Sequence, residues 1–138
     1  MPIESYRSLL VWQKSVDFAV LIYGLAGRFP RHEQYGLVSQ MQRAAVSIAS
    51  NIAEGKERQS DRDFARFITI AMGSLAELET QLLIAQRLGY LTESDWHEIL
   101  PLSDEIGKML RSLHKTLNIS KEPLIYSVLS FPRRREPS

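Results

Sequence analysis

Short breaks divide the first 117 residues of this 138-residue chain into four segments in which apolar residues recur at helical spacing. Pro30, Gly55 and Gly89 end segments, because proline disfavours helix at the preceding residue and glycine suits the position after a helix. Ser60 and Thr92 begin segments as N-caps, each with an aspartate three residues later. The sequence predicts helices over about 8–28, 34–54, 60–89 and 92–117.

The connections between these segments are only roughly three to six residues long, which favours antiparallel neighbours. We therefore predict an all-α fold, an antiparallel up-down four-helix bundle, in residues 1–117. Residues 118–138 then form a C-terminal tail that is mobile or docked at the periphery of the bundle. Pro101 lies inside the fourth segment, where the loss of a backbone hydrogen bond should kink or split the helix.

Composition excludes several classes of protein. The chain has no cysteine, so it has no disulfide framework, no thiolate nucleophile and no zinc site built on sulfur. The longest nearly apolar stretch, residues 18–27, has about half of the roughly 20 residues needed to span a bilayer. Residues 1–4 lack the features of a secretion signal. We expect a cytoplasmic protein with no membrane partner.

The first segment has two apolar strips, whereas a bundle helix needs one. We assign the wider strip to the core: Leu9, Trp12, Val16, Ala19, Val20, Tyr23 and Ala26. The second strip is then a candidate homo-oligomer interface, because a small monomer would leave it exposed; it consists of Val11, Phe18, Ile22 and Leu25. The alternative is that the tail covers this strip with its own apolar residues, Leu124, Ile125, Tyr126, Val128, Leu129 and Phe131.

A stripe of amides, hydroxyls, arginines and carboxylates runs beside the core face of the second segment and continues on the third. Such a mixture suits fixed hydrogen bonds better than bulk solvation. It comprises Gln40, Arg43, Ser47, Asn51, Glu54, Ser74 and Glu77. We expect Arg43 to pair with Glu77 or Glu54, and Gly73 to permit close approach of another helix. The stripe is either a structural polar network, an intersubunit seam, or a site for a ligand or nucleic acid.

The sequence resembles a known family in an ordered set of motifs. They are Leu10-Val11-Trp12-Gln13-Lys14, Phe29-Pro30, Glu33, Gly36-Leu37, Gln40, Arg43-Ala44-Ala45, Ser47-Ile48, Asn51-Ile52-Ala53-Glu54-Gly55, Arg58, Phe67, Ala71, Gly73-Ser74 and Glu77-Leu78-Glu79. The family is that of bacterial four-helix-bundle proteins first described as products of intervening sequences in 23S rRNA genes. Its relatives include the accessory protein of diversity-generating retroelements. The resemblance covers about residues 10–117, with Ala49 where the family often has proline.

This resemblance implies a ring-shaped homopentamer of four-helix bundles. It also implies binding of RNA or of a nucleic-acid enzyme such as a reverse transcriptase. No catalytic activity, cofactor or small-molecule substrate comes with the family.

The residues themselves also indicate a protein that is not an enzyme. His32, His97 and His114 are far apart and show no metal-ligand spacing, and the sequence lacks nucleophile-elbow and phosphate-loop motifs. Neighbouring carboxylates are one or two residues apart, so on a helix they point in different directions. We predict no catalytic residues, no metal site and no cofactor.

Two basic clusters are candidates for contact with nucleic acid, since phosphates are bound by lysine and arginine. The first surrounds the connection between the second and third segments (Lys56, Arg58, Arg62 and Arg66, with Arg43 on the stripe), and the second is the tail triplet Arg133, Arg134 and Arg135. Interleaved carboxylates weaken the first cluster, and the net charge of +1 divides into −1 for residues 1–117 and +2 for the tail. The leading hypothesis is a non-catalytic nucleic-acid-binding accessory protein; the alternative is a protein-interaction scaffold that does not contact nucleic acid.

Overall fold

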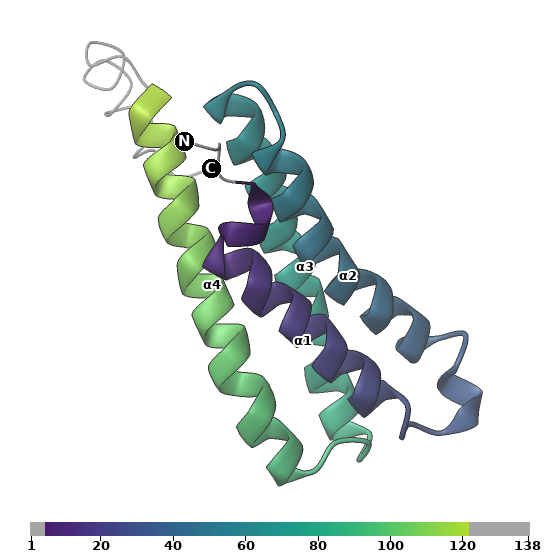
Figure 1. Ribbon diagram of the computed structural model, residues 1–138. Coiled ribbons are helices and arrows are strands. Elements are labelled where there is room, and N and C mark those ends of the chain that lie inside the picture. The colour runs from purple at the N-terminus through teal and green to yellow at the C-terminus, as the bar shows by residue number, and fades with distance from the viewer. Residues whose placement is uncertain (1–4, 122–138) are drawn as a thin grey trace, which may run out of the picture.

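The computed structural model describes residues 5–121, with side chains described as far as residue 118. The described residues form four α-helices and two short 3-10 turns, with no strand. The elements are η1 (Tyr6–Ser8), α1 (Leu10–Ala26), η2 (Arg31–Glu33), α2 (Leu37–Lys56), α3 (Asp61–Arg87) and α4 (Glu93–Lys121). The helices run up and down in sequence order, so the predicted antiparallel arrangement is seen in Figure 1. The contacts between helices are most extensive between α2 and α3.

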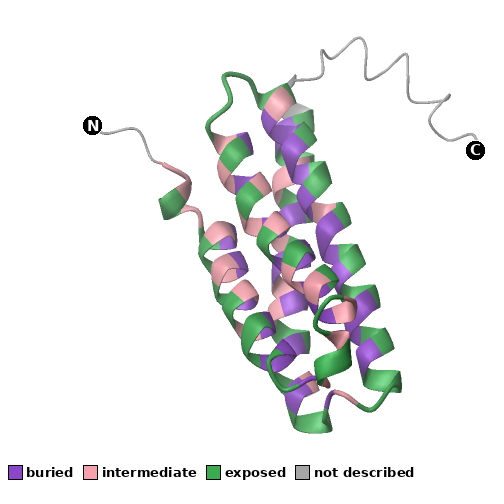
Figure 2. Cartoon of the chain, turned by 90° about the vertical axis from the view of Figure 1, so that its right-hand side faces the viewer, coloured by how far each residue is buried: buried purple, intermediate pink, exposed green. Residues whose placement is uncertain are grey.

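A single apolar core lies between the four helices, and Figure 2 shows the buried residues on their inward faces. Each helix supplies large side chains that water does not reach. Fully buried examples are Phe18, Ile22, Met41, Ile48, Ile52, Ile68, Leu78, Leu82, Ile99, Ile106 and Leu110. Removing this much apolar surface from water is the main stabilising contribution to the bundle.

The two apolar strips of α1 are exchanged relative to our prediction. Phe18 and Ile22 are completely buried, and Val11 and Leu25 are 6% and 5% exposed, so these four residues form core and not an interface between subunits. The strip runs on through Ser15, which is also buried and donates a hydrogen bond to the Val11 carbonyl at 2.7 Å. Most of the strip assigned to the core lines a surface groove facing α2, where Trp12 and Val20 lie, whereas Ala26 at its end is buried in the core as predicted.

The helix boundaries at Ser60, Gly89 and Thr92 are confirmed by their capping hydrogen bonds. The Ser60 hydroxyl accepts from the Asp63 N–H at 3.1 Å. Gly89 has φ of +85° and ends α3 in a Schellman motif. Thr92 and the buried Asp95 cap α4 reciprocally, each side chain accepting from the other's backbone N–H, at 3.0 and 2.8 Å.

Gly55 does not end the second helix as predicted. It lies within α2, which continues to Lys56. Gly55 does not have the positive φ of a glycine that ends a helix; among the described glycines, Gly89 has one. Its role is close packing: a Cβ built on Gly55 would be 2.7 Å from the Cβ of Phe67 and 3.0 Å from Cδ1 of Phe64. Glycine therefore allows α2 and α3 to meet closely just before the loop that joins them.

Pro101 does not split α4, which runs from Glu93 to Lys121 as one helix. Pro101 and His97 are both exposed, so the His97 carbonyl that lacks a helical partner can be hydrated. The helix also extends four residues beyond the predicted end at Leu117.

The third helix, α3, is strongly apolar. Among the described helices, α3 is the one that is long and apolar enough to cross a membrane, judged by length and composition alone. Its most apolar stretch of 18 residues has a mean hydropathy of 1.3. In the bundle its apolar residues pack against α2 and α4, as those of a core helix do. The core accounts for part of this hydropathy: 44% of the 18-residue stretch is buried, and Ile70, Leu83 and Ile84 remain exposed.

Candidate nucleic-acid interface

Three residues of the polar stripe form a hydrogen-bonded link between α2 and α3. The Oγ atoms of Ser47 and Ser74 are 2.8 Å apart. The Asn51 side-chain amide donates to the Ser47 carbonyl at 2.8 Å and to Ser47 Oγ at 2.9 Å. Ser74 is buried and the other two are half-buried. This part of the stripe is a structural network, because its polar atoms satisfy one another inside the helix pair.

The remaining residues of the stripe do not join this network. Gln40, Arg43, Glu54 and Glu77 are exposed. Glu54 pairs with Arg58, at 2.9 Å, and not with Arg43 as expected. Glu77 accepts a long hydrogen bond of 3.4 Å from Gln81 on its own helix. Arg43 is therefore a surface cation beside the network.

Gly73 also differs from expectation, because no atom of the described residues lies within 4 Å of a Cβ built on it. It is exposed on α3, so within one chain it does not permit a close approach of helices.

The basic cluster at the α2–α3 connection is built around Phe67. The guanidinium carbons of Arg58 and Arg66 lie 4.7 and 5.2 Å from the centre of this ring. Each arginine also pairs with a carboxylate nearby in the sequence: Arg58, in the loop after α2, with Glu54 at 2.9 Å, and Arg66 with Asp63 at 3.9 Å. The structure thus brings two of the four predicted cations onto one aromatic side chain, a cation–π arrangement that holds their charged groups in place.

Lys56 is half-buried and Arg62 is exposed near the same loop. Residues 54–66 contain four lysines and arginines and four carboxylates, so the loop region has no net charge. The second predicted cluster, Arg133, Arg134 and Arg135, lies outside the described residues, as does almost all of the tail 118–138.

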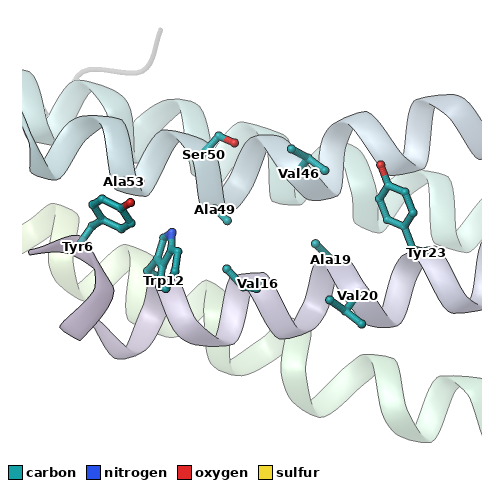
Figure 3. Close-up of a pocket in the computed structure, with 10 residues that line it drawn as sticks. All are labelled: Tyr6, Trp12, Val16, Ala19, Val20, Tyr23, Val46, Ala49, Ser50 and Ala53. Carbon is teal, nitrogen blue, oxygen red and sulfur yellow. The ribbon is translucent and has the colours of Figure 1, made fainter.

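Sequence reasoning missed two apolar grooves on the surface of the bundle. The first, of about 610 Å³, lies between α1 and α2 and is shown in Figure 3. It is lined by Tyr6, Trp12, Val16, Ala19, Val20, Tyr23, Val46, Ala49, Ser50 and Ala53. The signal for it was present in the wider apolar strip of α1, which we assigned to the core and which instead lines this groove.

The second groove, of about 520 Å³, lies between α3 and α4. Leu83 and Leu100 on its walls are 43% and 48% exposed. Beside them the indole N–H of Trp96 is buried without a hydrogen-bond partner among the described residues. This groove holds no cluster of metal ligands, and none is found elsewhere in residues 5–118.

Two of the three histidines, His32 and His114, have local structural partners. His114 lies with its Nε2 3.0 Å from the Thr69 hydroxyl. His32 approaches the Tyr90 hydroxyl at 3.4 Å, next to the shorter hydrogen bond of 2.9 Å that Tyr90 donates to Glu33. That hydrogen bond raises the pKa of Tyr90 above its ordinary value, with smaller contributions from burial and from the charge of Glu33.

Comparison with known proteins places this bundle in a family. The sequence model described as "23S rRNA-intervening sequence protein" matches residues 7–112. The chain belongs to the 23S rRNA-intervening sequence protein family. The matched residues include η1, α1, α2, α3 and most of α4, and therefore the Ser47–Asn51–Ser74 network and the cluster around Phe67.

A solved structure that is similar to this chain supports the same family assignment. It is the crystal structure of a protein of unknown function from the S23 ribosomal protein family of Bacteroides thetaiotaomicron. It is 34% identical to this chain, with a TM-score of 0.70, and the match covers 77% of this chain and 99% of the relative. The comparison with curated proteins gives no match. Neither the family description nor this relative indicates a catalytic activity.

Proposed function

We propose that this protein is a non-catalytic, oligomeric accessory protein that binds RNA or an RNA-containing complex in the cytoplasm. The observation that carries the proposal is the pair of arginines, Arg58 and Arg66, held against Phe67 at the end of the bundle. Planar guanidinium groups bind phosphate through paired hydrogen bonds. Arg62 and Lys56 extend this surface around the loop.

Oligomerisation strengthens this proposal, because one copy of the surface has no net charge and would bind weakly. A ring, a pentamer by resemblance to the family, would present several copies side by side, and their binding would reinforce one another. The exposed apolar residues of the α3–α4 groove, Leu83 and Leu100, support self-association. A reverse transcriptase or another nucleic-acid enzyme is a second partner consistent with the resemblance.

A salt titration with a fluorescently labelled RNA hairpin tests the RNA proposal. Binding should weaken steeply between about 50 and 200 mM salt if several phosphates are contacted. Replacing Arg58, Arg62 and Arg66 with alanine should reduce affinity by more than roughly tenfold and flatten the salt dependence. The matched control removes three exposed cations elsewhere, Arg87, Lys108 and Arg111, for the same change in net charge.

Equal losses in the two triple variants, or no binding at low salt, would overturn the RNA proposal. Light scattering tests the ring separately: a mass of several chains is expected, and a monomer would overturn it. Leu83→Glu with Leu100→Glu should lower that mass if the α3–α4 groove joins the subunits.

The alternative function is a protein-interaction scaffold without direct nucleic-acid contact. The balanced charges of residues 54–66 favour it, as do the two apolar grooves. On this alternative, the protein would bind a nucleic-acid enzyme in a pull-down with purified components after nuclease treatment, and the hairpin RNA alone would not bind.

A further inference from the structure

The groove between α1 and α2 leaves a continuous apolar surface on the described part of the chain. Val20 is 67% exposed, Tyr23 is 47% and Val46 is 43%, and Trp12 and Val16 are half-buried between them. Figure 3 shows these side chains on the two facing helices. Contiguous apolar surfaces of this kind are uncommon on a soluble domain unless another segment or partner covers them.

The same chain carries an apolar segment outside the described residues. Six of the eight residues 124–131 are Leu, Ile, Tyr, Val, Leu and Phe, and the other two are serines. A solvated extension is rich in charged and small polar residues instead. The sequence of this segment is therefore suited to burial against an apolar surface.

The end of α4 lies within reach of the groove. Lys14 of α1 and Glu105 of α4 form an ion pair at 3.2 Å, which sets the two helices in register. Along α4, the distance from Glu105 to Lys121 is about 24 Å. Along α1 and η1, the distance from Lys14 back to Tyr6, at one end of the groove, is roughly 12 Å in the same direction. Figure 1 shows both ends at the same end of the bundle.

The tail is long enough for this path. It must return roughly 12 Å along the bundle and cross one helix, which is about 10 Å. Ten residues lead from Lys121 to Phe131 and span up to about 33 Å when extended, so the later part of the segment, from Val128 on, can reach the groove.

The tail is also an addition to the shared domain. The family match ends at residue 112, and the solved relative is covered over 99% of its own length by 77% of this chain. Residues 122–138 lie beyond the residues that the family model matches. A segment outside the shared domain is a natural occupant for a surface that the bundle leaves uncovered.

We propose that residues 124–131 fold back across α1 and that the later part of this segment packs into the α1–α2 groove of the same chain. Val128, Leu129 and Phe131 would supply the apolar contacts. This inference concerns a surface distinct from the basic cluster and does not depend on RNA binding.

Crosslinking tests the docking directly, because the chain has no cysteine of its own. The test variant combines Ser50→Cys in the groove with Ser130→Cys in the tail, which leaves every apolar residue of both surfaces in place. The control combines Ser130→Cys with Thr69→Cys, an exposed site on α3 whose side chain faces His114 of α4. Both pairs are treated with a short bismaleimide in the full-length protein, and circular dichroism verifies folding of each.

The expected result is crosslinking within one chain that is at least roughly tenfold faster for the groove pair than for the α3 pair, as a docked segment has a high effective concentration. Adding Leu129→Asp and Phe131→Asp should remove the preference. A mixture of ¹⁵N-labelled and unlabelled protein separates links within a chain from links between chains by mass spectrometry. Equal rates for the two pairs, or products only between chains, would overturn the proposal; the second result would assign the groove to another copy.

Discussion

The hydroxyls of Ser47 and Ser74 lie 2.8 Å apart and join α2 to α3 where the two helices pass each other. Asn51 donates to the same Ser47 oxygen, so the contact is a three-residue network and not an isolated hydrogen bond. It lies in the most extensive helix–helix interface of the bundle. A link of this kind fixes the register of two helices whose apolar faces could otherwise slide by one turn.

Ser74→Ala should lower the free energy of unfolding by about 1 kcal/mol, because Ser47 loses its partner across the interface. Urea unfolding at neutral pH measures the change. Ser112→Ala, an exposed serine on α4, is the control and should stay within about 0.5 kcal/mol of the wild type. A Ser74→Ala variant as stable as this control would show that the network does not contribute.

Gly55→Ala should be destabilising by about 1–3 kcal/mol, because the added Cβ would overlap Phe67. Gly73→Ala tests the opposite case, since open space surrounds that helical glycine and alanine should stabilise it by about 0.5–1 kcal/mol. Thermal unfolding of both variants measures the contrast. If Gly55→Ala were neutral or stabilising, the close approach at Gly55 would be refuted.

Gly89→Ala should cost about 1–2 kcal/mol, because a φ of +85° is strained for any residue with a Cβ. The added methyl group meets nothing within 4 Å, so the loss would come from the backbone and not from packing. Denaturant unfolding measures it, and Gly89→Asn should recover part of the loss because asparagine tolerates this conformation. Equal stability of the alanine and glycine proteins would contradict the Schellman geometry.

Asp95→Asn should lower stability at neutral pH by about 1–3 kcal/mol. Burial raises the pKa of Asp95, but the hydrogen bonds from the Thr92 N–H and from Arg28 outweigh it and hold the pKa below its ordinary value of 3.8. A lowered pKa in the folded state means that the ionised carboxylate stabilises the fold above the ordinary pKa, and that this contribution disappears as the pH falls through the folded-state value.

The stability difference between the wild type and Asp95→Asn should therefore be largest near pH 7 and shrink below about pH 4. Urea unfolding across this pH range measures it, with the exposed Asp104→Asn as the control. A difference that is constant with pH would show that the ionised state of Asp95 does not matter.

Phe18→Ala should lower the free energy of unfolding by about 3–5 kcal/mol, the usual cost of truncating a buried aromatic residue. Light scattering alongside the unfolding curve distinguishes the two faces of α1. A variant that was as stable as the wild type but had a lower mass in light scattering would instead indicate that Phe18 lies in an interface between subunits.

The two ends of α3 and the beginning of α4 were predictable because caps are local. Ser60, Gly89 and Thr92 act through backbone groups within a few residues, so the sequence contains all the information needed. The arrangement of four antiparallel helices follows from their lengths and from the short connections.

The inward face of α1 was not predictable in this way, because both of its strips are apolar. Which strip faces the core depends on contacts with residues far along the chain. Ser15 added to the error: its polar side chain interrupts the buried strip in the sequence, but its hydroxyl is satisfied by the Val11 carbonyl inside the helix. The role of Gly55 was missed for the same reason, since its neighbour Phe67 belongs to another helix.

For the candidate site, the sequence predicted which charged residues are present but not how they are arranged. The sequence identifies Arg58 and Arg66 as nearby cations, but their positions depend on Phe67, whose ring becomes available only when α3 packs against α2. The pairing of Glu54 with Arg58 and not with Arg43 likewise depends on side-chain direction at the end of a helix.

The contact of both guanidinium groups with the Phe67 ring has a further consequence for the entropy of binding. A free arginine side chain loses about 2 kcal/mol of rotamer freedom when it is immobilised. Arg58 and Arg66 are already restricted by the ring and by Glu54 and Asp63, so the folded bundle has met part of that loss before any partner arrives. An anionic partner would displace two surface carboxylates and would have to remove only the freedom that the two arginines still retain.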